Sequence, residues 1–337
     1  MVMSINYKMV ERSAVKQSDS LFDEIRDGFS FVAENAQHVL IDQERLQTFA
    51  VSLPAFMPDN IFDEDHHYIG DDEQTAAYVM TLDAINFASG FDPGLREEGW
   101  PVIDDSLYFT IATCLKNYFV EHGPFSAAQL NGIEVSQVLE LLKLNFDGMV
   151  SFDFARLCTL SLRELGGMIL SQYNGSFYSF VQATQGQASN CVAMMARLQG
   201  FYDVHQYKGR NILILKRAQS MAADLNDAFT RKDGTALYSD IGKLTILPDN
   251  DIPHILRCEG VLRYSDELSA RIEKEQLIQS GCEEEVELRA CSAYAVEEMA
   301  KLKAMPVIEL DRILWHKCNE DISYKVGKAH RTRSRFY

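Results

Sequence analysis

Apolar residues recur every three or four positions through most of this chain, a spacing typical of amphipathic helices. In the clearest case, residues 21–34, the side chains of Phe22, Ile25, Phe29 and Val32 would share one helix face. The same pattern predicts helices over residues 75–87, 107–120, 135–144, 157–170, 190–198, 217–229, 284–305 and 307–318. The chain is therefore predicted to fold mainly from α-helices.

Two segments add detail to this helical framework. Ser265 is a suitable N-cap for one more helix, which would end near Gly281. A Lys208–Gly209 turn followed by an apolar run predicts a strand pair over residues 206–216, a small β element near the middle. No linker rich in Pro, Gly or Ser divides the chain, so we predict a single compact domain over residues 21–337 after an N-terminal extension over residues 1–20.

Charge limits the partners. The sequence has 32 Lys and Arg against 49 Asp and Glu, a formal net charge of −17. Long nucleic acids and anionic membranes require clustered cations, so we expect neither as a partner. A small anionic ligand needs only a few local cations and remains compatible with this charge. Nothing in the sequence indicates an obligate protein partner.

Cysteine usage indicates a compartment. The seven Cys are scattered without a CxxC pair, which favours free thiols over disulfides or zinc. The first residues lack the apolar core of a signal peptide. We therefore expect a cytoplasmic protein.

Common catalytic motifs, such as the glycine-rich phosphate loops and GxSxG, do not occur in the sequence. The run Asp63, Glu64, Asp65, His66 and His67 has the residue types of a metal site. Adjacent loop residues rarely converge on one ion, and no later segment completes a ligand set. We predict a solvated acidic loop here, and no metal.

Asp224 is a candidate functional carboxylate. In the predicted helix 217–229 it lies about 110° from the centre of the apolar stripe, at its flank. Lys216 and Ser220 precede it at steps of four and share its side. Such a carboxylate can face a cleft while the helix packs behind it, although a surface Asp in an ion pair is the simpler interpretation.

Two other segments have both a functional and a structural interpretation. Asp83, Asn86 and Phe87 could read and stack on a base, or Asn86 could simply cap a helix. The tail, residues 330–337, is basic in an otherwise acidic chain, and planar Arg side chains suit phosphate oxygens. The simpler alternative is a frayed terminus, or one held by the acidic surface.

Eight segments occur in an order that resembles the queuosine salvage protein family. They are FVAENAQHVLID (31–42), TLDAINF (81–87), YNGSF (173–177), LKRAQSMAAD (215–224), LPDNDIPHIL (247–256), GVLRYSDEL (260–268), EEVELRACS (284–292) and HRTRSRFY (330–337). The resemblance runs from about residue 20 to the C-terminus. Members of this family are queuosine 5′-phosphate N-glycosylases.

The resemblance implies hydrolysis of queuosine 5′-phosphate to queuine and ribose 5-phosphate, with water as second substrate and no cofactor. It also implies a helical fold similar to that of DNA base-excision glycosylases. Breaking the C1′–N bond develops positive charge on the ribose, which a carboxylate stabilises. The same carboxylate can orient or deprotonate the attacking water. Asp224 would have this catalytic role.

The resemblance also implies substrate contacts. The base is a 7-deazaguanine whose carbon at position 7 cannot be protonated, so hydrogen bonds to its other edges would assist its departure. The candidates near the base and its cyclopentenediol are Asp83, Asn86, Phe87 and Asp249, those near the phosphate are Lys216, His330, Arg331 and Arg333, and Tyr264 and Asp266 are further candidates.

Two departures from the family pattern concern the base pocket. Residues 88–90 replace an aromatic pair, and Thr110 stands near the place of a tryptophan. Base stacking would then be reduced, or Trp100 or Phe91 would supply it from a shifted loop. Two alternatives therefore stay open: a hydrolase of another purine-like ribonucleotide, and a non-catalytic module that binds queuine or its nucleotide.

Overall fold

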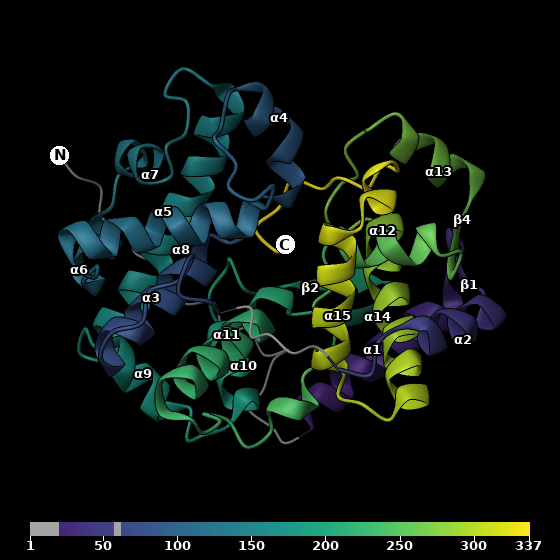
Figure 1. Cartoon of the computed structure of the whole chain (residues 1–337), viewed down its shortest axis with the longest axis horizontal. Coiled ribbons are helices and arrows are strands. Elements are labelled where there is room, and N and C mark those ends of the chain that lie inside the picture. Colours follow the sequence, from purple (N-terminus) through teal and green to yellow (C-terminus); the bar gives the residue numbers. More distant parts are fainter. Residues whose placement is uncertain (1–19, 57–61) are drawn as a thin grey trace.

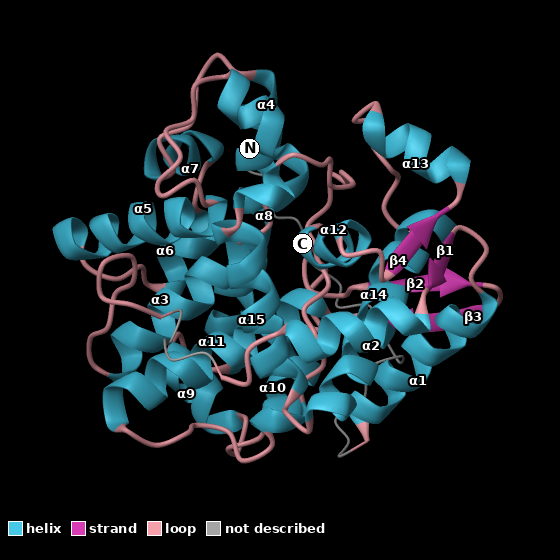
Figure 2. Cartoon of the chain, turned by 45° about the vertical axis from the view of Figure 1, so that its right-hand side comes forward, coloured by secondary structure: helices cyan, strands magenta, loops and turns pink. Residues whose placement is uncertain are grey.

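The computed structural model describes residues 20–56 and 62–337, and helices dominate this part of the chain (Figures 1 and 2). Two small antiparallel sheets of two strands each complete it. The predicted mainly α class with a small β element is confirmed. The predicted extension over residues 1–20 lies, except for Ser20, outside the described residues. The single-domain boundaries and the likeness to DNA glycosylases stay predictions.

The helices of the first part of the described chain include every one predicted there, with shifted ends. They are α1 Leu21–Asn35, α2 Gln43–Ser52, α3 Asp72–Ile85, α4 Asp92–Glu97, α5 Leu107–His122, α6 Ala127–Gly132, α7 Val135–Leu141, α8 Met149–Gln172, α9 Phe177–Ala183 and α10 Ala188–Met195. The predicted cap Asn86 does follow α3. The helices α2, α4, α6 and α9 are additional to those predicted.

The second part contains the remaining helices and most strands. The helices are α11 Lys216–Asp233, α12 Asp251–Cys258, α13 Asp266–Glu273, α14 Glu283–Lys303 and α15 Val307–Glu320, and the strands are β1 Val39–Ile41, β2 Val204–Tyr207, β3 Arg210–Leu213 and β4 Leu262–Tyr264. Ser265 caps α13 as predicted, accepting a hydrogen bond from the Leu268 amide. The predicted end near Gly281 is wrong, because α13 stops at Glu273 and Gly281 stands just before α14.

The predicted strand pair is confirmed as β2 and β3, joined by the Lys208–Gly209 turn. The apolar run that follows leaves the sheet after β3, since the amides of Ile214 and Leu215 both donate to the Asp203 carbonyl. The second sheet pairs β1 with β4, which are more than 200 residues apart in the chain. Short strands with so distant a partner give no local signal in the sequence.

Helix α11 lies in the middle of the molecule, where it packs against α3 and α10 (Figure 1). All its residues from Lys216 to Phe229 are buried, and Gly234 ends it in a left-handed conformation with φ of 75°. Around it, α1 packs on α14, and α8 packs on α3, α6 and α7. None of the helices in the described residues is long and apolar enough to cross a membrane.

Candidate functional site

A cavity of about 220 Å³ lies where the N-terminal ends of α5, α11 and α12 meet α15. Its lining combines acids, two cations and aromatic rings. The acids are Asp92, Asp105, Asp224, Asp249, Asp251 and Asp311, the cations are Arg96 and Lys216, and the aromatic residues are Tyr108, Trp315 and Tyr337. Such a space fits a small polar molecule better than a polymer.

Helix α11 presents one row of side chains to the cavity. Lys216, Ser220 and Asp224 all line it, as their spacing of four residues predicts. The helix packs behind them, so the interpretation of Asp224 as a simple surface residue is wrong. The same spacing on α15 brings Asp311 and Trp315 to the cavity wall.

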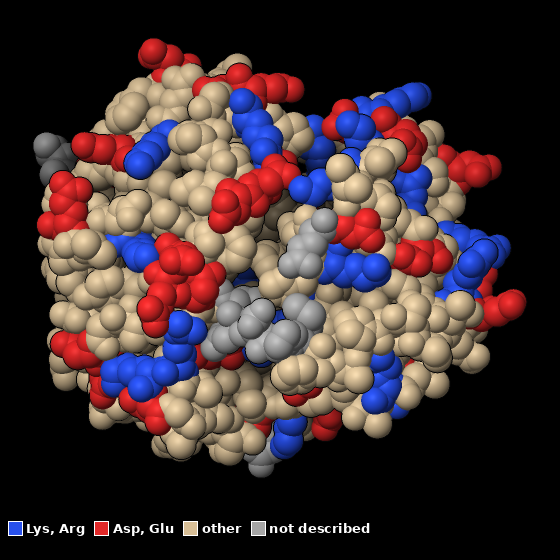
Figure 3. Space-filling model, in the orientation of Figure 1, with Lys and Arg blue, Asp and Glu red and all other residues tan. Residues whose placement is uncertain are grey.

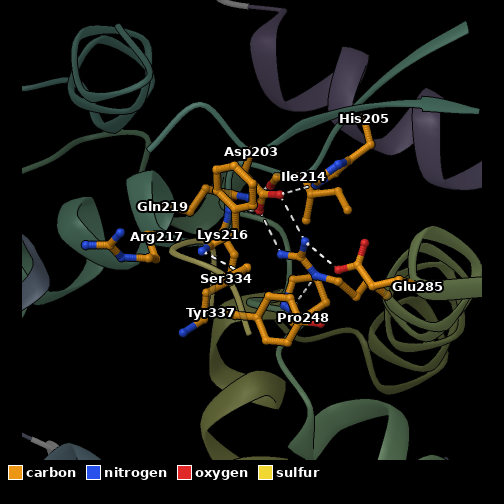
Figure 4. A network of polar contacts seen from close by, with 12 residues as sticks. Asp203, His205, Ile214, Lys216, Arg217, Gln219, Pro248, Glu285, Ser334 and Tyr337 are labelled. Carbon is orange, nitrogen blue, oxygen red and sulfur yellow. Dashed lines mark hydrogen bonds and ion pairs between the residues drawn. The ribbon is translucent and has the colours of Figure 1, made fainter. Parts of the chain in front are cut away.

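The start of α11 is fixed by a buried ion pair (Figure 4). Asp203 Oδ2 accepts a hydrogen bond of 3.2 Å from the Lys216 amide. Arg289 holds Asp203 through bonds of 2.9 and 2.7 Å, and the tail residue Tyr337 packs over the guanidinium of Arg289. Although burial opposes it, Arg289 lowers the pKa of Asp203 far below its usual range. This network supports Leu215, whose left-handed φ of 53° turns the chain into α11.

The fold brings the pKa of Asp224 close to neutral pH. It is 5% exposed, and burial followed by the negative charge of Asp227 raises the pKa of Asp224 to about 7. The positive charges of Arg312 and Lys216 oppose this rise. A carboxyl with a pKa near 7 is half ionised at neutral pH, which suits a group that must accept a proton and return it.

Asp83, on α3, is a second buried carboxyl near Asp224. Burial, and then the charge of Asp224, raise the pKa of Asp83 well above its usual range. The two carboxyl oxygens of Asp83 are buried and have no hydrogen-bond partner among the described residues, which also favours the neutral form of Asp83. Of the two buried carboxyls, Asp83 therefore favours its neutral form.

A tyrosine contacts Asp224 and connects it to a histidine. The Tyr108 hydroxyl is 3.4 Å from Asp224 Oδ2 and 2.9 Å from His67 Nε2. The His67 ring is fully buried and stacks on Phe62 at 4.1 Å between ring centroids. Burial lowers the pKa of His67 to about 4. His67 is therefore neutral at pH 7.

The prediction of a solvated acidic loop over residues 63–67 is right for Glu64, whose side chain is exposed, and wrong for His67. Its neighbour His66 is also largely buried, between the carboxylates of Asp63 and Asp104. The described residues contain no group of three or more side chains that could hold a metal ion.

Two more acids lining the cavity resist ionisation. Burial, together with the charge of Asp249, raises the pKa of Asp251 to about 8. Burial raises the pKa of Asp311 to about 7, although its hydrogen bond from the Leu247 amide works in the opposite direction. Protonated carboxyls can donate hydrogen bonds, so this wall offers donors as well as acceptors at neutral pH.

Four of the predicted site residues line the cavity: Asp224, Lys216, Asn86 and Asp249. Asp83 is 1% exposed and stands behind Asp224. Phe87 is also buried outside the lining, where its ring packs on Phe154 and on the guanidinium of Arg217. Asp83 therefore acts on the site through its neighbour Asp224, and Phe87 belongs to the core.

The other predicted site residues, all within the described part of the chain, lie outside the lining. Tyr264 donates a hydrogen bond to the Pro253 carbonyl, and Asp266 is exposed at the start of α13. The backbone of Arg331 forms a β-bridge with Leu277, and the guanidinium of Arg333 packs over the Phe91 ring.

The tail itself is not frayed. His330 is buried beside Tyr337, and its pKa is lowered to about 3 by burial, so it carries no charge for a phosphate. Arg335 pairs with Glu164, and the last residue, Tyr337, reaches the cavity. Alternation of buried and exposed side chains along the tail explains this placement, because its small polar residues face inward.

The aromatic wall differs from the expected one. Trp100 is buried and donates its indole N–H to the Leu142 carbonyl, and Phe91 packs on Phe154. Trp315 lines the cavity instead, with its ring edge-on to Tyr108 at 6.2 Å between centroids. The sequence did contain a signal for Trp315, namely its position four residues after Asp311 on one face of α15.

Together, the fold and the cavity define a mainly helical protein with an acid-rich site for a small molecule. The family model of the queuosine salvage protein matches residues 66–337, and the chain belongs to this family. It is 29% identical to a queuosine 5′-phosphate N-glycosylase/hydrolase of Sphaerobacter thermophilus, over 91% of this chain and 95% of the relative. It is 27% identical to the mouse protein of the same name, over 93% and 98% of the two chains.

Proposed function

We propose that this protein hydrolyses the N-glycosidic bond of queuosine 5′-phosphate and releases queuine and ribose 5-phosphate. The observation that carries the proposal is Asp224, a buried carboxyl with a pKa near 7 on the wall of the cavity. The names of the relatives supply the substrate, and the acid-rich lining supplies the chemistry.

In this reaction the ionised Asp224 stabilises the positive charge that develops at C1′ as the bond to the base breaks. It then accepts a proton from the attacking water while the C1′–O bond forms. Of the atoms of water, the oxygen and one proton stay on the ribose, and the other proton ends on the departing base. The neutral Asp83 nearby adds no second negative charge beside this carboxylate.

The departing 7-deazaguanine needs hydrogen-bond donors at its edges. Asp251 and Asp311 are suited to this, because their raised pKa values leave a large protonated fraction at neutral pH. Asn86 adds an amide from the end of α3. Trp315 offers a ring face for stacking, in place of the predicted Phe87.

For the 5′-phosphate we favour the cations that line the cavity over those of the tail. Lys216 is nearly buried at the start of α11, and Arg96 on α4 forms ion pairs with Asp92 and with Asp105, which lies just before α5. Helix N-termini favour anions, and α5 and α11 both begin here. This placement replaces the predicted clamp of His330, Arg331 and Arg333.

Two further expectations accompany the proposal. All seven Cys are free, as a reducing compartment requires, and this supports a cytoplasmic enzyme. On the face drawn in Figure 3, Lys and Arg are interspersed with Asp and Glu, which favours a free nucleotide over a long nucleic acid.

The test is to incubate the purified protein with queuosine 5′-phosphate, with guanosine 5′-phosphate alongside, and to detect the free bases by mass spectrometry. Release of queuine alone is the expected result. Release of guanine instead would support the alternative of a changed base preference. Thermal stabilisation by the queuosine nucleotide without release of any base would replace the enzyme with a binding module.

A further inference from the structure

The hydroxyl of Tyr108 stands between two partners but has one proton. Its oxygen is 2.9 Å from His67 Nε2 and 3.4 Å from Asp224 Oδ2. It can donate to only one of them and must act as an acceptor, or make no bond, toward the other. The direction of the shorter bond therefore decides whether Asp224 faces the proton or a lone pair of the Tyr108 hydroxyl.

His67 settles that direction. Its Nδ1 lies 3.1 Å from the Asp63 carbonyl oxygen, which can only accept, so Nδ1 carries the hydrogen. In a neutral ring Nε2 then has a free lone pair and accepts the proton of Tyr108. The ring cannot turn over freely, because it is fully buried, stacks on Phe62 and meets the edge of Tyr78.

Burial keeps the ring neutral. Lys116 of α5 and the neighbouring His66 disfavour a charged His67, and they add to the effect of burial. The Asp63 carboxylate, 3.8 Å from Nδ1, favours the charged form but does not outweigh burial. The titratable and charged groups that act on Asp224 are Asp83 on α3, Lys216 and Asp227 on α11, and Arg312 on α15.

We propose that His67 and Tyr108 form a positioning pair that presents the Tyr108 oxygen to Asp224 as a hydrogen-bond acceptor. The pair stabilises the protonated form of Asp224 and so makes it a stronger base for the attacking water. The consequence for hydrolysis rests on the proposed function, whereas the effect on the Asp224 carboxyl does not.

Two substitutions of His67 separate positioning from packing. His67→Asn places an amide N–H where Nδ1 stood and deletes the acceptor for Tyr108. His67→Gln places an amide oxygen near the position of Nε2 and keeps that acceptor. Each is made in the parent and together with Tyr108→Phe, and the Asp224 carboxyl is titrated by carbon NMR, with its signal assigned from its loss in Asp224→Asn.

In the parent background, His67→Asn should lower the Asp224 titration midpoint by about one pH unit, because the freed Tyr108 proton turns to the carboxylate. His67→Gln should leave the midpoint close to that of the parent. With Tyr108→Phe present, the two substitutions should give the same midpoint. Equal shifts from Asn and Gln, or a difference that survives Tyr108→Phe, would overturn the proposal.

A measurement on the unchanged protein covers the case in which a variant does not fold. Nitrogen NMR of His67 should show the neutral tautomer with hydrogen on Nδ1 throughout pH 5–8, and hydrogen on Nε2 would overturn the proposal. The acidic limb of kcat/KM should move to lower pH in His67→Asn together with the midpoint. A protein that shows the NMR shifts without hydrolysis would refute the proposed function and leave the positioning pair intact.

Discussion

Replacing the buried Asp224 with Asn should change how stability depends on pH. The unfolded chain ionises this carboxyl near its ordinary pKa of 3.8, whereas the fold raises the pKa to about 7. A raised carboxyl pKa stabilises the fold fully below pH 3.8, and this contribution is lost as pH rises to about 7. The parent should therefore lose stability over this window through Asp224, and Asp224→Asn should not.

The size of the effect follows from the window. Between pH 5 and about pH 7 the unfolded chain has lost this proton while the folded protein still holds it. The free energy of unfolding falls by ~1.4 kcal/mol for each of these two pH units, so between pH 5 and pH 9 the parent should lose roughly 3 kcal/mol more stability than Asp224→Asn. Urea unfolding of both proteins at the two pH values measures this difference. Asp266→Asn, at an exposed position on α13, controls for the removal of one acid from an acidic protein. Parallel pH profiles for parent and Asp224→Asn would refute the argument.

Three more substitutions test other parts of the account. Arg96→Ala should raise KM for queuosine 5′-phosphate about tenfold more than KM for queuosine, as expected for the loss of one charged contact. Arg333→Ala is the matched control, and a larger effect from this substitution would assign phosphate binding to the tail. Trp315→Ala should raise KM roughly tenfold with little change in kcat, because base stacking is worth about 1–3 kcal/mol, and an unchanged KM would remove this ring from the base site. Asp203→Asn should lower the free energy of unfolding by about 3–5 kcal/mol, since it removes one of the two buried carboxylates that pair with Arg289. A loss below 1 kcal/mol in urea unfolding would show that the pair does not anchor α11.

The helical framework and one face of the site could be predicted because both depend on local spacing. A repeat of four residues placed Lys216, Ser220 and Asp224 on one side of α11, and the cavity is found on that side. The same rule applied to α15 would have found Trp315.

The remaining parts of the site depend on contacts between distant segments. His67 reaches Tyr108 only because its loop packs against α3 and α5. Nothing local in the sequence distinguishes this buried residue from Glu64, which lies three positions earlier and is exposed. The tail arginines looked like a phosphate clamp by composition, but Glu164 and the ring of Phe91 take up Arg335 and Arg333. Charge in a sequence shows what a segment can bind, whereas the fold decides which partner it meets.

The most direct test of the central claim compares the parent with Asp224→Asn on queuosine 5′-phosphate. Single-turnover hydrolysis and equilibrium binding are measured for both proteins. The account predicts that Asp224→Asn binds the nucleotide within a few-fold of the parent and releases queuine at least a thousandfold more slowly, a loss of about 4 kcal/mol of transition-state stabilisation. Hydrolysis at the parental rate by a folded Asp224→Asn protein would contradict it.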